Sequence, residues 1–364
     1  MDKSSILNLK LFSISLICAF FLLAGTFSNS AYGQEKAATG PEKPFEPKEI
    51  ILEHISDSHS WPLAIPLVEE RMLPLPIILY TDKGLEVFSS GNLMPKGTIY
   101  HAANHNYILD GETVKIVDAA GTIDEAASKK VMDFSITRDV ACMFMAIAIL
   151  LVIFLSVAGS YKKSVGKAPK GLQSFLEPLI LFVRDDIAMP NIGIRYVRFM
   201  PLLLTIFFFI LLNNLLGMVP FFPGGYNLTG NIAVTAVLSV IIFFVVNLNG
   251  NKHYWKHIFV PNPWWLFFIM IPVEIVGIFT KPIALMIRLF ANITAGHILI
   301  LSLISLIFIF KTLWVSPVSI VFVVFMDAIE LLVAFLQAYI FTLLGALFIG
   351  MAIEEHHDHE QEVI

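Results

Sequence analysis

The sequence is poor in charge and nearly free of cysteine. Only 15% of its 364 residues are Asp, Glu, Lys or Arg, and 2 are cysteines. The formal net charge is −5, so no basic excess points to a nucleic-acid partner. Cys18 and Cys142 each lie within an apolar run, and we therefore expect no disulfide.

Motifs of nucleotide chemistry and of metal binding are also missing. No Gly-x4-Gly-Lys-Ser/Thr loop occurs, the nearest string being Gly166-Lys167-Ala168, and no serine or cysteine triad can be assembled. The chain is therefore not expected to be catalytic alone, and no cofactor is predicted. Several histidines match no strong metal-ligand spacing, so we interpret them as residues of solvated loops and predict no metal site. They are His54, His59, His101 and His105.

Apolar residues dominate instead. The chain is 57% hydrophobic, contains 31 Phe and has a mean hydropathy of +0.76, which is typical of a membrane protein. Residues 1–33 combine two early lysines, an apolar core and the small-residue end Ala31-Tyr32-Gly33. This pattern predicts a secretory signal peptide cut after Gly33, with an uncleaved first membrane helix as the alternative.

Residues 34–134 turn polar and predict a small, β-rich, extracytoplasmic domain. Short strands are expected over Leu75–Tyr80, Leu85–Ser89 and Thr98–His101. Asp110-Gly111 lies between alternating flanks and predicts a hairpin with a two-residue turn. Nothing in this part of the sequence indicates a function.

Three membrane spans follow, at Val140–Gly159, Phe199–Val219 and Asn231–Leu248. Gly171–Ala188 has an apolar face at helical spacing, which predicts a helix on the membrane surface. The second span, Phe199–Val219, contains Asn214, which could line an aqueous path or bond to another helix. We include it among the candidate site residues.

The number of Lys and Arg residues alternates between the segments that connect the membrane spans. Seven lie between Ser160 and Phe199, none in residues 220–230, and Lys252 and Lys256 follow the next span. This asymmetry predicts a multi-pass protein of the cell inner membrane, with the N-terminal domain outside and the C-terminus in the cytoplasm. The acidic, histidine-containing end at 358–364 is interpreted as a solvated tail.

Two apolar segments are too long for simple spans. Pro263–Phe310 would extend about 70 Å and Val315–Ile353 about 58 Å as helices, against a hydrocarbon core of about 30 Å. Each is either a hairpin or one steeply tilted helix, and the absence of a polar turn favours tilt. The predicted fold class is an all-α membrane protein with three transmembrane helices and two long tilted ones, plus the exported β-rich domain.

The first long segment contains Arg288 at its middle. An arginine at bilayer depth costs from roughly 3 to more than 10 kcal/mol, so a functional role is the default, with snorkelling to an interface as the alternative. At 100° per residue, three other polar residues share its stripe, whereas His297 points to the opposite side. The three are Glu274, Lys281 and Asn292.

The string from Lys281 to His297, KPIALMIRLFANITAGH, resembles the arginine-bearing helix of subunit a of rotary F-type ATP synthases. Ile287 departs from that pattern, because many members have Leu there. The stretch from Glu330 to Phe341, ELLVAFLQAYIF, is similar to the family's last helix. The likeness covers roughly residues 133–357, and the membrane domain is predicted to span 135–357.

The resemblance implies a stator subunit that forms two proton half-channels against a rotor ring of c subunits, with Arg288 separating them. Peripheral stalk b subunits, the bilayer and, indirectly, the catalytic sector are the other implied partners. Glu274, Asn292, His297, Glu330 and Gln337 are the implied proton-path residues, with Gln337 beside Arg288. Members often have Glu at the position of His297 and His at that of Glu330, so this chain exchanges the pair.

Two other classes of function compete with this interpretation. A proton- or ion-coupled secondary transporter or channel would also contain intramembrane ionisable residues, but we find no internal repeat. A scaffold for the external domain would not need Arg288. The sequence leaves proton versus sodium open, although an imidazole at His297 favours protons because it is a poor Na⁺ ligand.

Overall fold

The computed structural model describes residues 56–62, 72–95, 97–118, 121–163, 166, 168–219, 224–226, 228–259, 267–310 and 315–353. The predicted signal peptide and tail lie outside these residues. Contacts divide the chain into two compact units. The first comprises Met1–Phe154, Leu215–Leu228 and His297–Asp327, and the second comprises Leu155–Asn214, Thr229–Gly296 and Ala328–Ile364.

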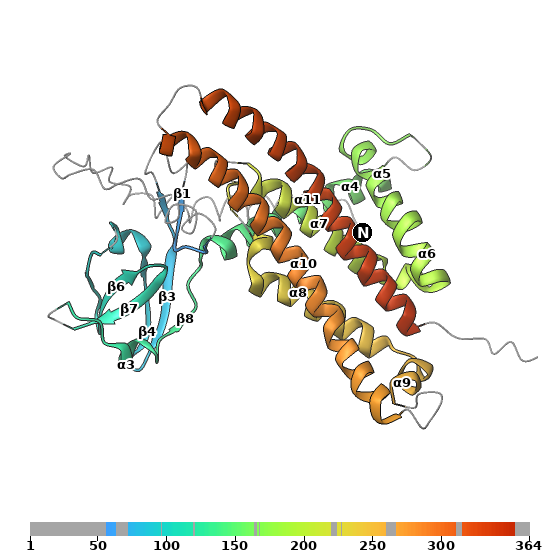
Figure 1. Ribbon diagram of the computed structural model, residues 1–364, viewed down its shortest axis with the longest axis horizontal. Helices are drawn as coiled ribbons and strands as arrows, with labels where there is room; N and C mark the ends of the chain where they lie inside the picture. Colours follow the sequence, from blue (N-terminus) through green and yellow to red (C-terminus); the bar gives the residue numbers. More distant parts are fainter. Residues whose placement is uncertain are drawn as a thin grey trace, which may run out of the picture. The chain divides into compact units, whose positions relative to one another are not determined.

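The N-terminal part of the first unit is β-rich, as predicted (Figure 1). Its strands form three small antiparallel sheets, ordered β1-β2, β4-β3-β8 and β5-β6-β7. The core lies between the latter two sheets, where Ile77, Leu79 and Phe88 pack with Tyr107 and Leu109. The strands are β1 Ser60–Pro62, β2 Met72–Pro74, β3 Pro76–Thr81, β4 Gly84–Ser89, β5 Tyr100–His101, β6 Asn106–Asp110, β7 Thr113–Val117 and β8 Met132–Asp133.

The predicted hairpin is present but its turn lies one residue later. Asp110 pairs with Thr113, so the two-residue loop is Gly111-Glu112, and Gly111 has a φ of 63°. Asp110 therefore ends strand β6 rather than entering the turn. A positive φ is available to glycine without steric cost, which is why the turn forms at Gly111.

The interpretation of the histidines as solvated is wrong for two of them. The His59 side chain is buried and its Nε2 lies 3.2 Å from Asp133 Oδ2. His105 is nearly buried, with Nε2 3.2 Å from Asp82 Oδ1. Carboxylate neighbours offset the cost of removing these imidazoles from water. Within the described residues, no group of three or more His, Cys, Asp or Glu is placed to hold a metal ion, and His54 lies outside them.

After the β-rich domain the described residues are mostly helical, and they contain five stretches long and apolar enough to cross a membrane. This agrees with the predicted number of membrane-embedded helices. The main helices are α4 Arg138–Lys163, α5 Leu172–Phe182, α7 Tyr196–Gly217, α8 Ile232–Asn249, α9 Lys252–Phe259, α10 Phe267–Phe310 and α11 Val315–Ile353.

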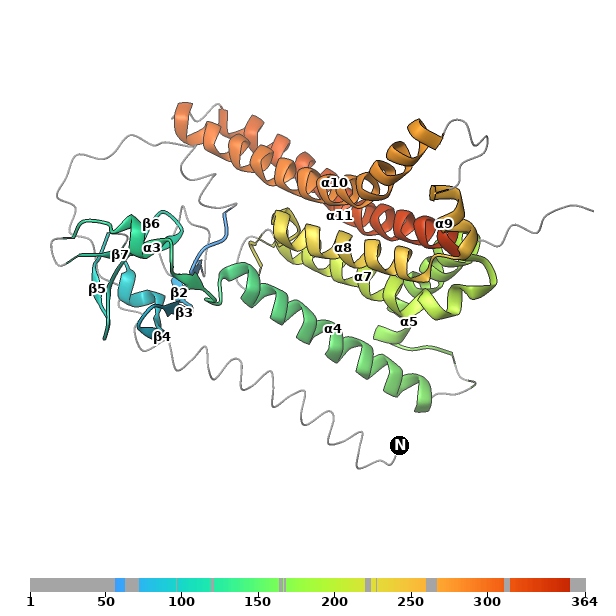
Figure 2. The ribbon, with the colours of Figure 1, turned by 90° about the horizontal axis from the view of Figure 1, so that it is seen from below.

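Each of the two long segments is a single helix, so the hairpin alternative is wrong. Helix α10 has 44 residues and α11 has 39. Pro272 and Pro282 lie inside α10 without reversing it. They cannot donate to the helical ladder, and Figure 2 shows that α10 bends along its length.

The helix expected at 171–188 is present and extends further than predicted. Helix α5 continues through the π-helical segment Val183–Ala188, then through α6 Met189–Ile192 and a short 3-10 segment, into α7. Gly193, with a φ of 70°, ends α6 and allows the change of direction. Gln173 is buried and accepts a hydrogen bond of 3.1 Å from Ser160, whereas Phe175 is exposed.

The β-rich domain is joined to α4 without a flexible linker. The backbone N–H groups of Phe134, Ile136 and Arg138 donate in turn to the carbonyls of Ile78, Pro76 and Ser58. These bonds are 2.9, 3.1 and 2.8 Å long. The same unit buries Trp61, whose indole N–H donates to the Gly224 carbonyl at 3.4 Å.

Candidate functional site

In the second unit, α10 and α11 run antiparallel and in contact. Gly296 faces Glu330, Arg288 faces Gln337, and Lys281 faces Phe348. Residue numbers rise along one helix as they fall along the other, which fixes the antiparallel register. Figures 1 and 2 show the two helices side by side.

Arg288 lies at the middle of α10 and its residue is exposed. Twenty-one residues precede it in the helix, from Phe267 on, and 22 follow to Phe310, about 30 Å on either side. Leu285, Leu289 and Ile293 form the buried side of the helix. The exposed side around the arginine contains three alanines, Ala284, Ala291 and Ala295, together with Ile287 and Asn292.

Gln337 is beside Arg288, as expected. Its side chain is buried, and Nε2 donates to the backbone carbonyl of Arg288 at 3.1 Å. The acceptor belongs to the main chain, so the contact holds α11 against α10 at the level of the arginine while the guanidinium is left to other interactions. A buried amide without such a partner would cost about 1–3 kcal/mol.

Glu330 lies on the same face of α11 as Gln337 and is buried. Its carboxylate packs against Gly296, where an added Cβ would lie 3.2 Å from Oε1. Sequence reasoning missed this glycine, although a glycine within a helix costs about 1 kcal/mol and so indicates a close approach. The next residue, His297, belongs to the first unit, where Nε2 lies 3.8 Å from the Cβ position of Gly217.

Asn214 bonds to residues of two other segments. Its buried side chain donates from Nδ2 to the Ala334 carbonyl at 3.2 Å and accepts from Thr229 Oγ1 at 2.7 Å. It therefore links α7, α11 and the segment before α8, which is interhelical hydrogen bonding. Its neighbour Asn213 donates to the Phe209 carbonyl within α7.

The predicted stripe on α10 is not uniform in its surroundings. Arg288 and Asn292 are exposed, whereas Glu274 and Lys281 are half-buried. The Lys281 Nζ lies 5.4 Å from the ring centroid of Phe348 on α11. Helices packed against the part of α10 around Lys281 therefore cover half of the stripe, which a helical projection cannot show.

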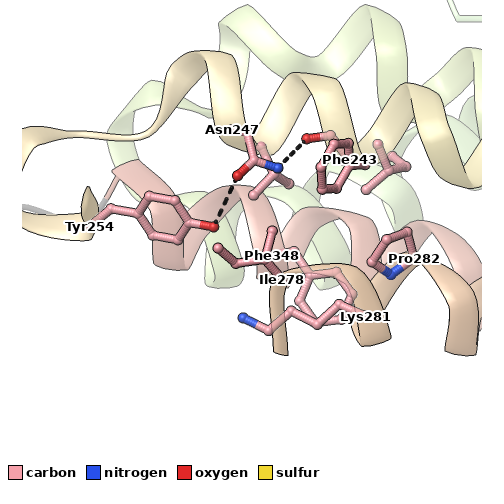
Figure 3. A pocket seen from close by; sticks show the side chains of 9 residues that line it. Phe243, Asn247, Tyr254, Ile278, Lys281, Pro282 and Phe348 are labelled. Carbon is pink, nitrogen blue, oxygen red and sulfur yellow. Dashed lines mark hydrogen bonds between the residues drawn. The ribbon is translucent and has the colours of Figure 1, made fainter. Parts of the chain in front are cut away.

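A small cavity lies beside Lys281 (Figure 3). At about 20 Å³ it has room for about one water molecule. Asn247 of α8 accepts a hydrogen bond of 3.4 Å from the Tyr254 hydroxyl of α9 and donates to the Phe243 carbonyl at 2.7 Å. Burial raises the pKa of Tyr254, and the nearby Glu274 carboxylate raises it further.

The helices of this chain are long enough to cross a membrane. One of them has an exposed arginine at its middle, and the helices facing it contain buried Glu, Gln and Asn. Such intramembrane polar groups are typical of an integral membrane protein that moves ions. Comparison with known families gives the particular family. A family model described as ATP synthase A chain matches residues 140–350, more than half of the chain. The chain belongs to this family.

Relatives support the same assignment. ATP synthase subunit a of Chloroherpeton thalassium is 51% identical over 236 residues, which are 63% of this chain and 70% of the relative. ATP synthase subunit a 2 of Prosthecochloris aestuarii is 51% identical over 237 residues, 63% of this chain and 72% of the relative. The family prediction is thus confirmed, and with it the role of a membrane-sector stator subunit that is not an enzyme alone.

The N-terminal domain matches a different family. A model described only as a domain of unknown function covers residues 50–134. The match to the ATP synthase family begins after it, at residue 140. What the β-rich domain does is therefore a separate question from what the membrane helices do.

Proposed function

We propose that Arg288 is the charge past which the rotor carboxylates move, and that the exposed face of α10 around it packs against the ring of c subunits. The observation that carries this proposal is the exposure of Arg288 at mid-helix, on a face that contains three exposed alanines. Alanines let a second helix approach closely within a membrane, so this face suits a helical partner. An arginine without such a partner would be costly at this depth.

Electrostatics supply the reason for arginine. A unit charge about 4 Å from a carboxylate, at an effective dielectric of 20, favours the ionised form by about 4 kcal/mol, which is about 3 pH units. The guanidinium does this without releasing its own proton. Arg288 would therefore make each passing carboxylate release its proton and would block a direct leak between the two half-channels.

The remaining polar groups suit two separate access routes. Glu274, Lys281 and Tyr254 gather beside the link that contains Lys252 and Lys256, which the lysine asymmetry assigns to the cytoplasm. Glu330 lies in the opposite direction along α10 from Arg288, against Gly296, whereas Gln337 lies at the level of the arginine. We assign the first group to the cytoplasmic route, and Glu330, His297 and Asn292 to the outer one.

In this proposal the role of Asn214 is structural. Its hydrogen bonds to Ala334 and Thr229 hold α7 against α11 one turn from Gln337. It would shape the wall of the outer route rather than exchange protons.

Orientation and assembly complete the proposal. The N-terminal domain lies outside the cytoplasm and the C-terminus inside, in the cell inner membrane. Helices α10 and α11, at about 66 and 58 Å, exceed a core of about 30 Å, so they lie steeply tilted along the rotor. Stalk b subunits hold the chain as part of the stator and connect it to the catalytic sector.

The test is Arg288→Ala in the assembled complex. We expect ATP-driven proton pumping and ATP synthesis to be abolished while the rotor ring still copurifies with the variant. Arg195→Ala is the matched control, because it removes an exposed arginine of the same chain far along the sequence from the site. Near-normal pumping by Arg288→Ala in membrane vesicles would refute the assignment.

A further inference from the structure

The sheet β4-β3-β8 of the N-terminal domain has an apolar outer face. Tyr80 of β3 pairs with Leu85 of β4 and with Met132 of β8, which forms one row across three strands. Ile78 pairs with Val87, and its carbonyl accepts a bond from the Phe134 N–H, which forms a second row. We call these six residues the outer sheet face.

Five of the six are exposed side chains. The exposed fractions are 53% for Tyr80, 63% for Leu85, 59% for Val87, 59% for Met132 and 63% for Phe134. Ile77, Leu79 and Phe88 alternate with these residues and form the core with β6 and β7. A sheet with one solvated face normally alternates apolar and polar residues, so apolar residues on both faces indicate that the outer one is covered in use.

The position of this face in the chain limits what can cover it. Phe134 is six residues from Val140, where the apolar part of α4 begins, and six extended residues reach about 20 Å at most. The three backbone hydrogen bonds at Phe134, Ile136 and Arg138 restrict the conformation of this connection. The outer sheet face is therefore held close to the point where the chain enters the bilayer.

The direction of the face also fits. In both Figure 1 and Figure 2, α4 leaves β8 on the side of the sheet opposite to β5-β6-β7. The outer sheet face is turned away from those strands, because the core lies between the two sheets. It therefore faces the side on which the first membrane helix runs.

The rim of the face has positive charge. Lys129 and Lys130 are exposed and precede β8, next to the turn between β3 and β4 because Tyr80 pairs with Met132. Lys83 lies in that turn, and its Nζ donates to the Asn104 carbonyl at 3.0 Å. Asp82 of the same turn is engaged by His105 at 3.2 Å. Lysines beside apolar and aromatic side chains match the boundary between phosphate headgroups and acyl chains.

We propose that the outer sheet face rests on the outer leaflet of the bilayer. Tyr80 and Phe134 then lie at headgroup level, where aromatic side chains concentrate, and the lysines contact lipid phosphates. The β-rich domain is thereby a second, peripheral membrane contact of the chain, beside its membrane helices. This inference does not depend on the role proposed for Arg288.

The test places a fluorophore on the face in the full chain. In a background with Cys18→Ala and Cys142→Ala, Val87→Cys is labelled with an NBD probe, and the chain is reconstituted in vesicles of phosphatidylcholine and phosphatidylglycerol. Thr113→Cys, exposed on β7 at the other sheet, is the matched control. Quenching is measured with aqueous iodide and, separately, with phospholipid bearing a doxyl group near the headgroup end of its chain.

We expect the probe at Val87 to be quenched by doxyl lipid and to be several-fold less sensitive to iodide than the probe at Thr113. Omitting phosphatidylglycerol should weaken lipid quenching at Val87 only. Equal, strong iodide quenching at both sites would overturn the proposal, because the face would then be in water. Protection from both quenchers would also overturn it, in favour of a protein cover such as a second copy or another subunit.

Discussion

Gln337 Nε2 donates a hydrogen bond to the main-chain carbonyl of Arg288, not to its side chain. The contact therefore survives any substitution of the arginine side chain. Substitution of Gln337 should therefore affect helix packing, whereas substitution of Arg288 should affect charge.

Replacing Gln337 by Met keeps the side-chain volume but removes the donor. We expect a loss of about 1 kcal/mol in α10–α11 packing and a partial decrease in proton pumping, since Arg288 stays in place. Thr342→Val is the control, because Thr342 is buried in α11 but donates within its own helix, to Ala338. Pumping rates of assembled complexes measure the effect. Equal losses in the two variants would show that the hydrogen bond to Arg288 has no special part.

Gly296 predicts a graded steric effect. An alanine Cβ would lie 3.2 Å from Glu330 Oε1 and 3.5 Å from its Cδ, so Gly296→Ala should displace the carboxylate, and Gly296→Val should do so more strongly. Gly277→Ala in the same helix meets nothing within 4 Å and should be neutral or stabilising by about 0.5–1 kcal/mol. Pumping by all three variants is compared at matched complex yield. Wild-type activity in Gly296→Val would contradict the close packing of Glu330.

The exchanged pair His297 and Glu330 predicts a coupled response. Each single swap, His297→Glu or Glu330→His, creates two like groups that compete for one charge state, and pumping should fall partially and with altered pH dependence. The double swap restores one carboxylate and one imidazole and should recover more activity than either single variant. Pumping rates of the four proteins form a double-mutant cycle, in which strictly additive losses would show that the two residues do not share a path.

Asp133 predicts acid sensitivity at the joint between the domain and α4. Burial alone would raise its pKa, but hydrogen bonds from His59 and Ser135 outweigh burial and hold the pKa below its usual value. A lowered pKa in the folded state gives stability that is present above the unfolded value of about 3.9 and is lost as pH falls through the folded value. His59→Ala should therefore shift the acid loss of protection in residues 133–137 to higher pH.

Hydrogen exchange measured by mass spectrometry, corrected for the intrinsic rate at each pH, reports this shift. His59→Gln retains a donor and should lie between the wild type and His59→Ala. Identical acid midpoints in all three proteins would argue that the contact between His59 and Asp133 contributes nothing to the joint.

Local patterns in the sequence predicted the elements well. Hydropathy predicted α11 with the same bounds, Val315–Ile353, that the structure has. A long apolar run can be recognised without knowing which residues it contacts. The hairpin at Gly111 followed from turn chemistry, with an error of one residue. The family strings also identified Arg288 and Gln337 as neighbours.

Features that depend on tertiary contacts were beyond the sequence. The burial of His59 requires Asp133, 74 residues away. The hydrogen bonds of Asn214 depend on Ala334 and Thr229, which lie 120 and 15 residues away. The apolar outer sheet face was also missed, because Tyr80 and Leu85 fit a strand pattern whichever side they face.

The hydrogen-bonded passage from β8 into α4 has a practical consequence for imaging this protein. A membrane subunit buried among lipids offers little outside the bilayer by which particles can be aligned. Because backbone hydrogen bonds fix the joint, an antibody fragment raised against the β6–β7 hairpin would keep a fixed direction relative to the N-terminal end of α4. Such a fragment would act as a fiducial for aligning particle images, and changes in its angle between functional states would report directly on the tilt of that helix.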